Sequence, residues 1–463
     1  MENSTKKWIA LTVISAIQFI LLLDATVVNV ALPKIKEDLG FNDASLTWVV
    51  NSYLIAAGSL LLLGGKIGDA YGLSKTFKIG VLIFGIFSFI AAFSSTPIML
   101  IISRTGQGVG EALASATGLA IVSRLFSTDP ERSKAFAIWA ALGGFGSIFG
   151  VLLSGVLTEF LSWRWVFGIN VPLIIIMYVS ILIFVPAFTS KHRIKLDLKN
   201  ALLLVVSVFI LVLSIVGSGL EQLMWLRLLL LILSISCILF ILKRCKNSEN
   251  GIIPARLMKK SPRVIGYIIV AILAANSGAL FYLGVLILQN HLNLSPMQSG
   301  LAWLPFCVGF FPGLFLFQYI NESKGSKNAA LIGLVLAAIG FILFTIGTPL
   351  NNYWIGVMPA MLITSIGFGC VAPVSQYLAT IGLDEDDSGI GGGITTTIQQ
   401  LLQVGGVAIL SLAAVSYSSH FDNKYFITKN GFSVAFSLST CLIIAVIIII
   451  LIKGRTLENS PES

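Results

Sequence analysis

Charged side chains are scarce in this sequence. Asp, Glu, Lys and Arg together make up 11% of its 463 residues, whereas they make up about 25% of a typical soluble domain. Hydrophobic residues make up 56% of the chain, and the mean hydropathy is +0.93. This composition excludes an ordinary soluble globular protein and predicts an all-α membrane protein that crosses the lipid bilayer many times.

Chemically reactive residues are also few. The three histidines all fall between apolar segments, and the five scattered cysteines form neither a CxxC pair nor a metal-binding spacing. The chain contains no nucleotide-binding loop, nucleophile elbow or HExxH motif. We therefore expect no enzyme activity, no metal and no cofactor. If the chain moves a solute across the membrane, the energy would come from an ion gradient such as the proton gradient.

Long apolar segments, by contrast, recur along the whole chain. A membrane-spanning helix needs about 20 consecutive and mostly apolar residues. Fourteen segments meet this requirement, near residues 8–31, 44–65, 77–95, 98–123, 134–157, 164–187, 199–217, 224–242, 263–288, 297–319, 328–348, 353–378, 389–416 and 432–452. An even number of spans places both termini on the same side of the membrane.

The basic residues indicate which side that is. With both termini in the cytoplasm, 23 of the 30 Lys and Arg residues fall on the cytoplasmic face and 6 on the outer face, while Arg104 lies inside a span. Cytoplasmic loops accumulate Lys and Arg, so we expect both termini to be cytoplasmic. The net charge of +9 then follows from topology and requires no nucleic-acid partner.

Two short stretches indicate an internal duplication. Residues 67–72 and 320–325 share an isoleucine, an acid and a glycine at equal spacing, and internal repeats are common in secondary transporters. The two stretches fall in matching loops when two central spans are set aside. The predicted plan is six spans, two additional spans with basic flanks, and six spans, with domains at residues 1–190, 191–262 and 263–463.

A carboxylate lies within the first apolar segment. At such a depth Asp24 costs roughly 2.5–3.5 kcal/mol on insertion scales, so we expect it to be paired, to face water or to take up a proton. Arg104, in the fourth segment, lies at a similar distance from the outer end. We therefore expect an Asp24–Arg104 pair, in which Arg104 either takes part in proton coupling or only holds spans one and four together.

A second acid follows on the same helix face. Glu111 comes seven residues after Arg104, which is two helical turns further into the membrane. That depth is near the midplane, where transporters bind substrates and coupling ions. Glu111 is thus a second candidate for proton coupling, and the alternative is a protonated acid that hydrogen bonds to a neighbouring helix.

Four sequence motifs lie at residues 23–33, 65–72, 104–110 and 163–167, the last followed by Asn170 and Pro172. They resemble those of the major facilitator superfamily, and within it the fourteen-span drug:proton antiporters, which include quaternary-ammonium and tetracycline efflux pumps of Gram-positive bacteria. The span-five signature of these antiporters is present in part, since Gly146, Gly150 and Gly155 are kept while Val151 replaces its proline.

The resemblance implies a function. It implies the major facilitator fold and an antibiotic-resistance exporter of lipophilic, cationic drugs in a bacterial plasma membrane. Such a protein works as a monomer by alternating access and exchanges its substrate for protons. The resemblance also implies a gating role for Asp69, which we favour over the alternative of an ordinary surface acid in a glycine-flanked turn.

Several aromatic and amide residues inside the spans are candidates for substrate binding. Aromatic rings attract cations, although such residues also serve in packing and in hydrogen bonds between helices. The candidates are Asn51, Tyr53, Trp139, Asn276, Tyr282, Gln399, Gln400 and Gln403.

Two alternatives to multidrug export remain open. The same fold could export an endogenous metabolite, a lipid, a peptide or a metal–tetracycline complex. A membrane receptor or scaffold that transports nothing is the alternative from another class, and the acids inside apolar spans argue against it.

Overall fold

A computed structural model provides the fold of the chain. It describes residues 2–126, 129–188, parts of 202–214, 224–246, 261–380, 385–421 and 427–453. Every regular element in these described ranges is a helix, as the composition predicts. The span expected over residues 199–217 and the basic stretches beside the two additional spans lie largely outside the described residues.

The chain divides into two compact units. The first consists of Met1–Ile253 and Glu385–Leu401, and the second consists of Pro254–Asp384 and Leu402–Ser463. Helix α14 (Glu385–Phe421) therefore contributes to both units, with the division directly after Leu401.

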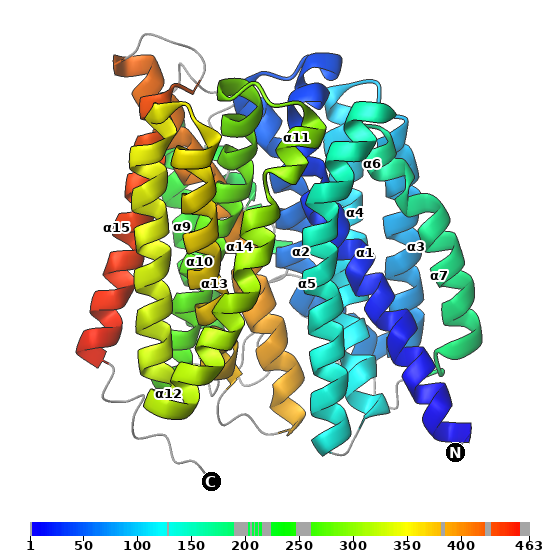
Figure 1. Cartoon of the computed structure of the whole chain (residues 1–463). Coiled ribbons are helices and arrows are strands. Elements are labelled where there is room, and N and C mark those ends of the chain that lie inside the picture. Colours follow the sequence, from blue (N-terminus) through cyan, green and yellow to red (C-terminus); the bar gives the residue numbers. More distant parts are fainter. Residues whose placement is uncertain are drawn as a thin grey trace. The chain divides into compact units, whose positions relative to one another are not determined.

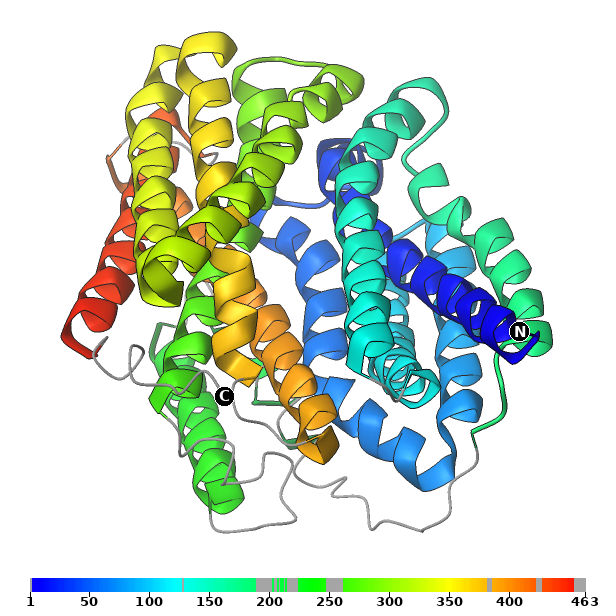
Figure 2. The same ribbon diagram turned by 60° about the horizontal axis from the view of Figure 1, so that its bottom comes forward.

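The first unit is built around helices α1 and α4. Helix α4 packs against α2 and α3, while α1 packs against α5 and α7, an arrangement that can be followed in Figures 1 and 2. The helices of this unit are α1 (Glu2–Leu39), α2 (Asp43–Tyr71), α3 (Leu73–Ala92), α4 (Pro97–Leu125), α5 (Asp129–Phe160), α6 (Trp165–Gly168), α7 (Asn170–Phe184) and α9 (Met224–Lys246).

The second unit is built around α12 and α13. These two helices pack along each other, and α10 and α15 pack against them. The buried rings of Phe341, Phe344 and Phe436 form part of the core, with the centroids of Phe344 and Phe436 4.9 Å apart. Besides α14, the elements are α10 (Ser261–Leu286), η2 (Ile287–His291), α11 (Pro296–Leu301), α12 (Leu304–Gly347), η3 (Thr348–Leu350), η4 (Tyr353–Val357), α13 (Met358–Thr380) and α15 (Lys429–Lys453).

Eight helices in the described part of the chain are long and apolar enough to cross a membrane. A ninth is added if the two arms of α2, which meet at an angle of 50°, are counted as one span. The protein is therefore a multi-pass membrane protein, and the total of fourteen spans remains a prediction.

The start of α2 illustrates how local sequence defines a helix. The Asn42 side chain accepts a hydrogen bond from the backbone N–H of Ser45 at 2.6 Å, and the Ser45 hydroxyl accepts one from the backbone N–H of Asn42 at 3.0 Å. This reciprocal cap satisfies N–H groups that have no partner inside the helix. The helix therefore begins where the sequence changes from polar to apolar.

The two stretches that indicate a duplication end in the same backbone conformation. Gly72 joins α2 directly to α3 with a φ of 101°, and Gly325 interrupts α12 with a φ of 78°. Residues with a side chain rarely adopt positive φ, which explains why both stretches end in glycine. The helix pair α2–α3 and the two arms of α12 thus have the same single-residue junction, as the predicted repeat requires.

Gly150 of the span-five signature allows α5 to approach α1 closely. A Cβ atom at Gly150 would lie 2.6 Å from the backbone carbonyl oxygen of Leu23 and would also collide with the Thr26 hydroxyl. This contact is next to Asp24. The glycine therefore sets the distance between α5 and the segment of α1 that carries the carboxylate.

We predict that Gly150→Ala lowers the melting temperature of the purified protein. The added methyl group has to displace the α1 backbone, and overpacking of this kind costs about 1–3 kcal/mol. Gly405→Ala is the matched control, because a Cβ there meets no described atom within 4 Å. Equal melting temperatures for the two variants would contradict the close α1–α5 packing.

Candidate functional site

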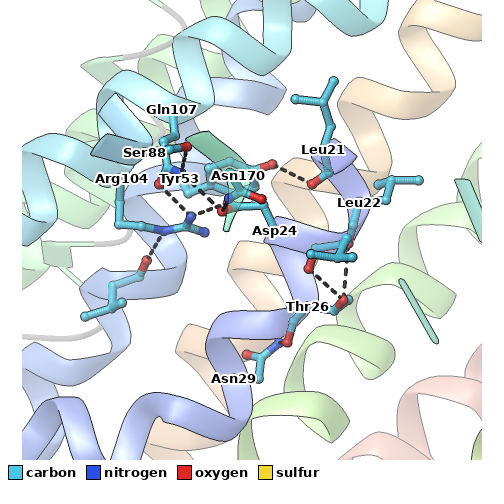
Figure 3. Close-up of polar contacts among 12 residues, drawn as sticks. Leu21, Leu22, Asp24, Thr26, Asn29, Tyr53, Ser88, Arg104, Gln107 and Asn170 are labelled. Atoms are coloured by element: carbon cyan, nitrogen blue, oxygen red, sulfur yellow. Dashed lines mark hydrogen bonds and ion pairs between the residues drawn. The ribbon is translucent and has the colours of Figure 1, made fainter. Parts of the chain in front are cut away.

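Asp24 lies at the centre of a buried polar network in the first unit (Figure 3). Its Oδ2 accepts a hydrogen bond from Nη1 of Arg104 at 2.5 Å, and the two residues form an ion pair with no exposed side-chain surface. Its Oδ1 accepts from the amide groups of Asn170 at 2.6 Å and Gln107 at 3.1 Å. Both carboxylate oxygens are thus satisfied, and the charge is neutralised by a guanidinium.

Arg104 is held by further contacts on α4 and α2. Its Nη1 also donates to the side-chain oxygen of Gln107 at 2.8 Å, and its Nε donates to the backbone carbonyl of Val49 at 3.1 Å. The guanidinium lies 4.1 Å from the centroid of the Tyr53 ring, a cation–π arrangement. Its Nη2 has no hydrogen-bond partner among the described residues. Arg104 therefore links spans one, two and four and keeps one donor free.

The structure confirms the pairing of Asp24 with Arg104 and adds three residues to it. Gln107 also donates to the hydroxyl of Ser88 on α3 at 2.8 Å, so the network reaches α3 and, through Asn170, α7. Gln107 and Asn170 lie within sequence motifs noted above, but neither motif indicated a contact with Asp24. The available signal was the spacing of Arg104, Gln107 and Glu111, which share one face of a helix.

Glu111 has a different environment. Its Oε1 accepts a hydrogen bond from Nε2 of Gln400 on α14 at 2.9 Å, a contact within the first unit. Its Oε2 has no hydrogen-bond partner, and Glu111 forms no ion pair, among the described residues. The side chain is 1% exposed. Glu111 is thus a buried acid with one oxygen unbonded among the described residues, whereas both oxygens of Asp24 are hydrogen-bonded.

Asp69 lies apart from this network. It is exposed near the end of α2, and Arg124, in the last turn of α4, is its oppositely charged neighbour. The structure thus places an acid and a base at neighbouring helix ends, which is compatible with the gating role inferred from the resemblance.

Comparison with known proteins identifies the family. The sequence pattern of the Major Facilitator Superfamily matches residues 14–407. The chain belongs to this superfamily.

Its relatives in the superfamily include bacterial resistance proteins. The puromycin resistance protein of Streptomyces alboniger is 30% identical, with 99% of this chain and 93% of the relative covered. The lincomycin resistance protein of Streptomyces lincolnensis is 29% identical, with coverages of 97% and 92%. The family makes this chain a transporter rather than an enzyme, and its bacterial relatives agree with a location in the plasma membrane.

The fold agrees with that of the superfamily. The crystal structure of the nucleoside transporter NupG, in a mutant form, matches with a TM-score of 0.66 and covers 96% of this chain and 99% of its own. Sequence identity is 15%, so this likeness supports the fold and carries no information on the substrate.

The substrate-binding candidates of this superfamily member are distributed over both units. In the first unit, Asn51 is buried with neither side-chain polar atom hydrogen-bonded among the described residues, and Trp139 is half-buried in α5. Tyr53 donates to the carbonyl of Leu21 at 3.2 Å and stacks on Arg104. Gln399 is exposed. Tyr53 is thus an integral part of the buried network.

The other candidates belong to the second unit. Asn276 is buried and donates to the carbonyl of Ile272 in its own helix at 2.8 Å, while its Oδ1 has no partner in the described part. Tyr282 is buried in α10. Gln403 is half-buried and packs closely against Gly278.

A groove of about 370 Å³ lies between α3 and α4. Apolar atoms form nearly all of its surface, and none of the substrate-binding candidates lines it. It is lined by Ile83, Phe87, Ile102, Thr105, Gly106 and Val109.

We predict that Asp24→Asn destabilises the protein strongly, because it leaves Arg104 charged and buried without a counterion. Breaking a buried ion pair in this way costs about 3–5 kcal/mol. Thermal unfolding in detergent measures the loss, and the double variant Asp24→Asn/Arg104→Gln should regain much of it.

Asp38→Asn provides the matched control. Asp38 pairs with Arg164 at 2.7 Å, but the two side chains are 51% and 38% exposed. An exposed pair contributes about 0–1 kcal/mol, so this variant should unfold close to the wild-type temperature. Equal losses for Asp24→Asn and Asp38→Asn would contradict the role assigned to burial.

Proposed function

We propose that this protein is a proton-coupled multidrug exporter that moves lipophilic, cationic compounds out of the cell by alternating access. In this proposal the chain acts as a monomer with fourteen spans, arranged as six, two and six, and both termini are cytoplasmic. Two relatives are named as puromycin and lincomycin resistance proteins. Their names support the export of small antibiotics in this proposal.

The observation that carries the proposal is the unequal state of the two buried acids. Asp24 accepts three hydrogen bonds, one of which is its ion pair with Arg104, whereas one oxygen of Glu111 accepts none among the described residues. An ionised carboxylate is very costly to bury without a countercharge. Glu111 is therefore the acid that takes up and releases the proton in this proposal, and Asp24 keeps its negative charge.

Exchange between proton and drug follows from this charge balance. Two acids and Arg104 are buried together in the first unit, so loss of the Glu111 proton leaves one negative charge without a partner. A cationic drug supplies the missing positive charge. Proton and drug then compete for the same carboxylate, which is the requirement for antiport.

Arg104 couples the two acids. Its charge acts on Glu111 as well as on Asp24, and its Nη2 donor has no partner within the described residues. A small rotation of the guanidinium toward Glu111 would weaken the pair with Asp24. In this proposal the proton affinity of each acid thus depends on which of them Arg104 contacts.

Asp69 completes the proposal as a gating residue. Its charge is attracted by that of Arg124 at the neighbouring helix end. Gly72, three residues after Asp69, joins α2 directly to α3. Making and breaking this electrostatic contact would accompany closure and opening at this end of the first unit.

We predict that Glu111→Gln abolishes uptake of a fluorescent cation into inverted proteoliposomes when only a pH gradient drives it. The glutamine retains the shape and the hydrogen bonds of a protonated glutamic acid but cannot release a proton. The measurement is the initial uptake rate with and without the imposed gradient.

Glu37→Gln is the matched control, because Glu37 is exposed and pairs with the exposed Lys34. It should transport at the wild-type rate. Gradient-driven uptake by Glu111→Gln, at normal expression, would exclude Glu111 as the coupling acid.

A further inference from the structure

Gln400 is the direct partner of Glu111, although the two residues are 289 positions apart in the chain. Both are buried, with 7% and 1% of their surfaces exposed. Their hydrogen bond runs from Nε2 of Gln400 to Oε1 of Glu111. One oxygen of each side chain, Oε1 of Gln400 and Oε2 of Glu111, has no partner in the described part of the chain.

A glutamine can bond both protonation states of a carboxyl group, but with different ends of its amide. An ionised carboxylate only accepts hydrogen bonds, so it requires the N–H of the amide. A protonated carboxyl group also has an O–H to donate, which only the amide oxygen can accept. The Nε2–Oε1 hydrogen bond seen here is the orientation that suits the ionised acid. Half a turn of the Gln400 amide exchanges these two atoms. The orientation of Gln400 therefore depends on whether Glu111 carries its proton.

The other groups that face Glu111 are already engaged. Asp24 from α1 and Arg104 from α4 act on its charge, and the Tyr53 hydroxyl from α2 lies within hydrogen-bonding reach of its carboxyl group. Asp24 and Arg104 are bonded to each other, and the Tyr53 hydroxyl donates to the carbonyl of Leu21. Gln400, from α14, is the neighbour that bonds Glu111 directly and keeps an unused acceptor, within the described residues.

Gln400 bonds Glu111 from a position close to the end of the α14 segment that belongs to the first unit. The part of α14 that belongs to the first unit ends at Leu401, one residue after Gln400. The helix backbone is close to α2 at this point, since a Cβ at Gly58 would lie 2.8 Å from Cβ of Gln400. The Gln400 side chain therefore bonds α14 to α4 near the end of the α14 segment that belongs to the first unit.

We propose that Gln400 is a positioning residue that transmits the protonation state of Glu111 to α14, rather than a ligand of the transported drug. Loss or gain of the Glu111 proton reverses the Gln400 amide and so changes the hydrogen bond that joins α14 to α4 within the first unit. The O–H bond of Glu111, which breaks when its proton leaves and forms when a proton returns, is the one covalent bond that changes. This inference rests on the proposed function, because it assigns the structural response to the coupling acid.

The test uses the full-length protein in lipid nanodiscs, with its native cysteines replaced and a spin label at Leu402→Cys, an exposed position on α14. The label mobility is titrated against pH. We expect a single pH-dependent transition in this background and none after Glu111→Gln. Gln400→Met, which keeps the side-chain length but cannot hydrogen bond, should abolish the transition and lower gradient-driven uptake at least tenfold.

Three further measurements separate positioning from other roles. Gln399→Met, the exposed neighbouring glutamine, should behave as the unmutated background. Gln400→Glu, which can again donate or accept, should keep a transition and so excludes a mere packing defect. Binding of the fluorescent cation at fixed pH should change less than twofold in Gln400→Met.

The possible failures are distinguishable. A normal transition in Gln400→Met, or a loss of drug affinity of tenfold or more with the transition intact, would overturn the role of Gln400. If only that happened, with Glu111→Gln still uncoupled, the proposed function would stand. Gradient-driven uptake by Glu111→Gln would overturn both.

Discussion

The buried ion pair between Asp24 and Arg104 constrains the whole first unit. Neither charge can remain in a low-dielectric interior alone, because each loses its hydration there. Asn170, Gln107 and the Val49 carbonyl supply the remaining hydrogen bonds. The pair therefore fixes how the helices that carry these groups pack against one another in this conformation.

Glu111 differs from Asp24 because Arg104 already neutralises the charge of Asp24. Arg104 neutralises one carboxylate, and the second, two helical turns away on α4, is left with an amide as its direct partner. The same side-chain chemistry thus produces one structural acid and one exchangeable acid. The difference arises from the number of donors around each carboxyl group.

Part of this site is predictable from the sequence, and the reason is geometric. Counting residues from the ends of two spans gives the depths of Asp24 and Arg104, and opposite charges at equal depth in a membrane have few alternatives to pairing. Gln107 and Asn170 could not be predicted in the same way, since an amide in a span has many possible partners. The Glu111–Gln400 contact depends on which helices are neighbours, and a separation of 289 residues carries no such information.

The same distinction holds for the fold. The helical class and the membrane location follow from composition, and the two similar stretches both end in a glycine with positive φ, Gly72 and Gly325. The span-five glycines were recognisable as a signature, but the contact of Gly150 with the α1 backbone appears only when α1 and α5 are packed. Sequence alone therefore indicated which residues were unusual, and the structure indicated what they touch.

The glycine junctions have a mechanical consequence. Gly72 is at once the last capping residue of α2 and the first of α3, so no loop separates the two helices. A loop would absorb the displacement of one helix before it reached the other. Because one residue joins α2 to α3, a change in the tilt of one helix is transmitted directly to the other.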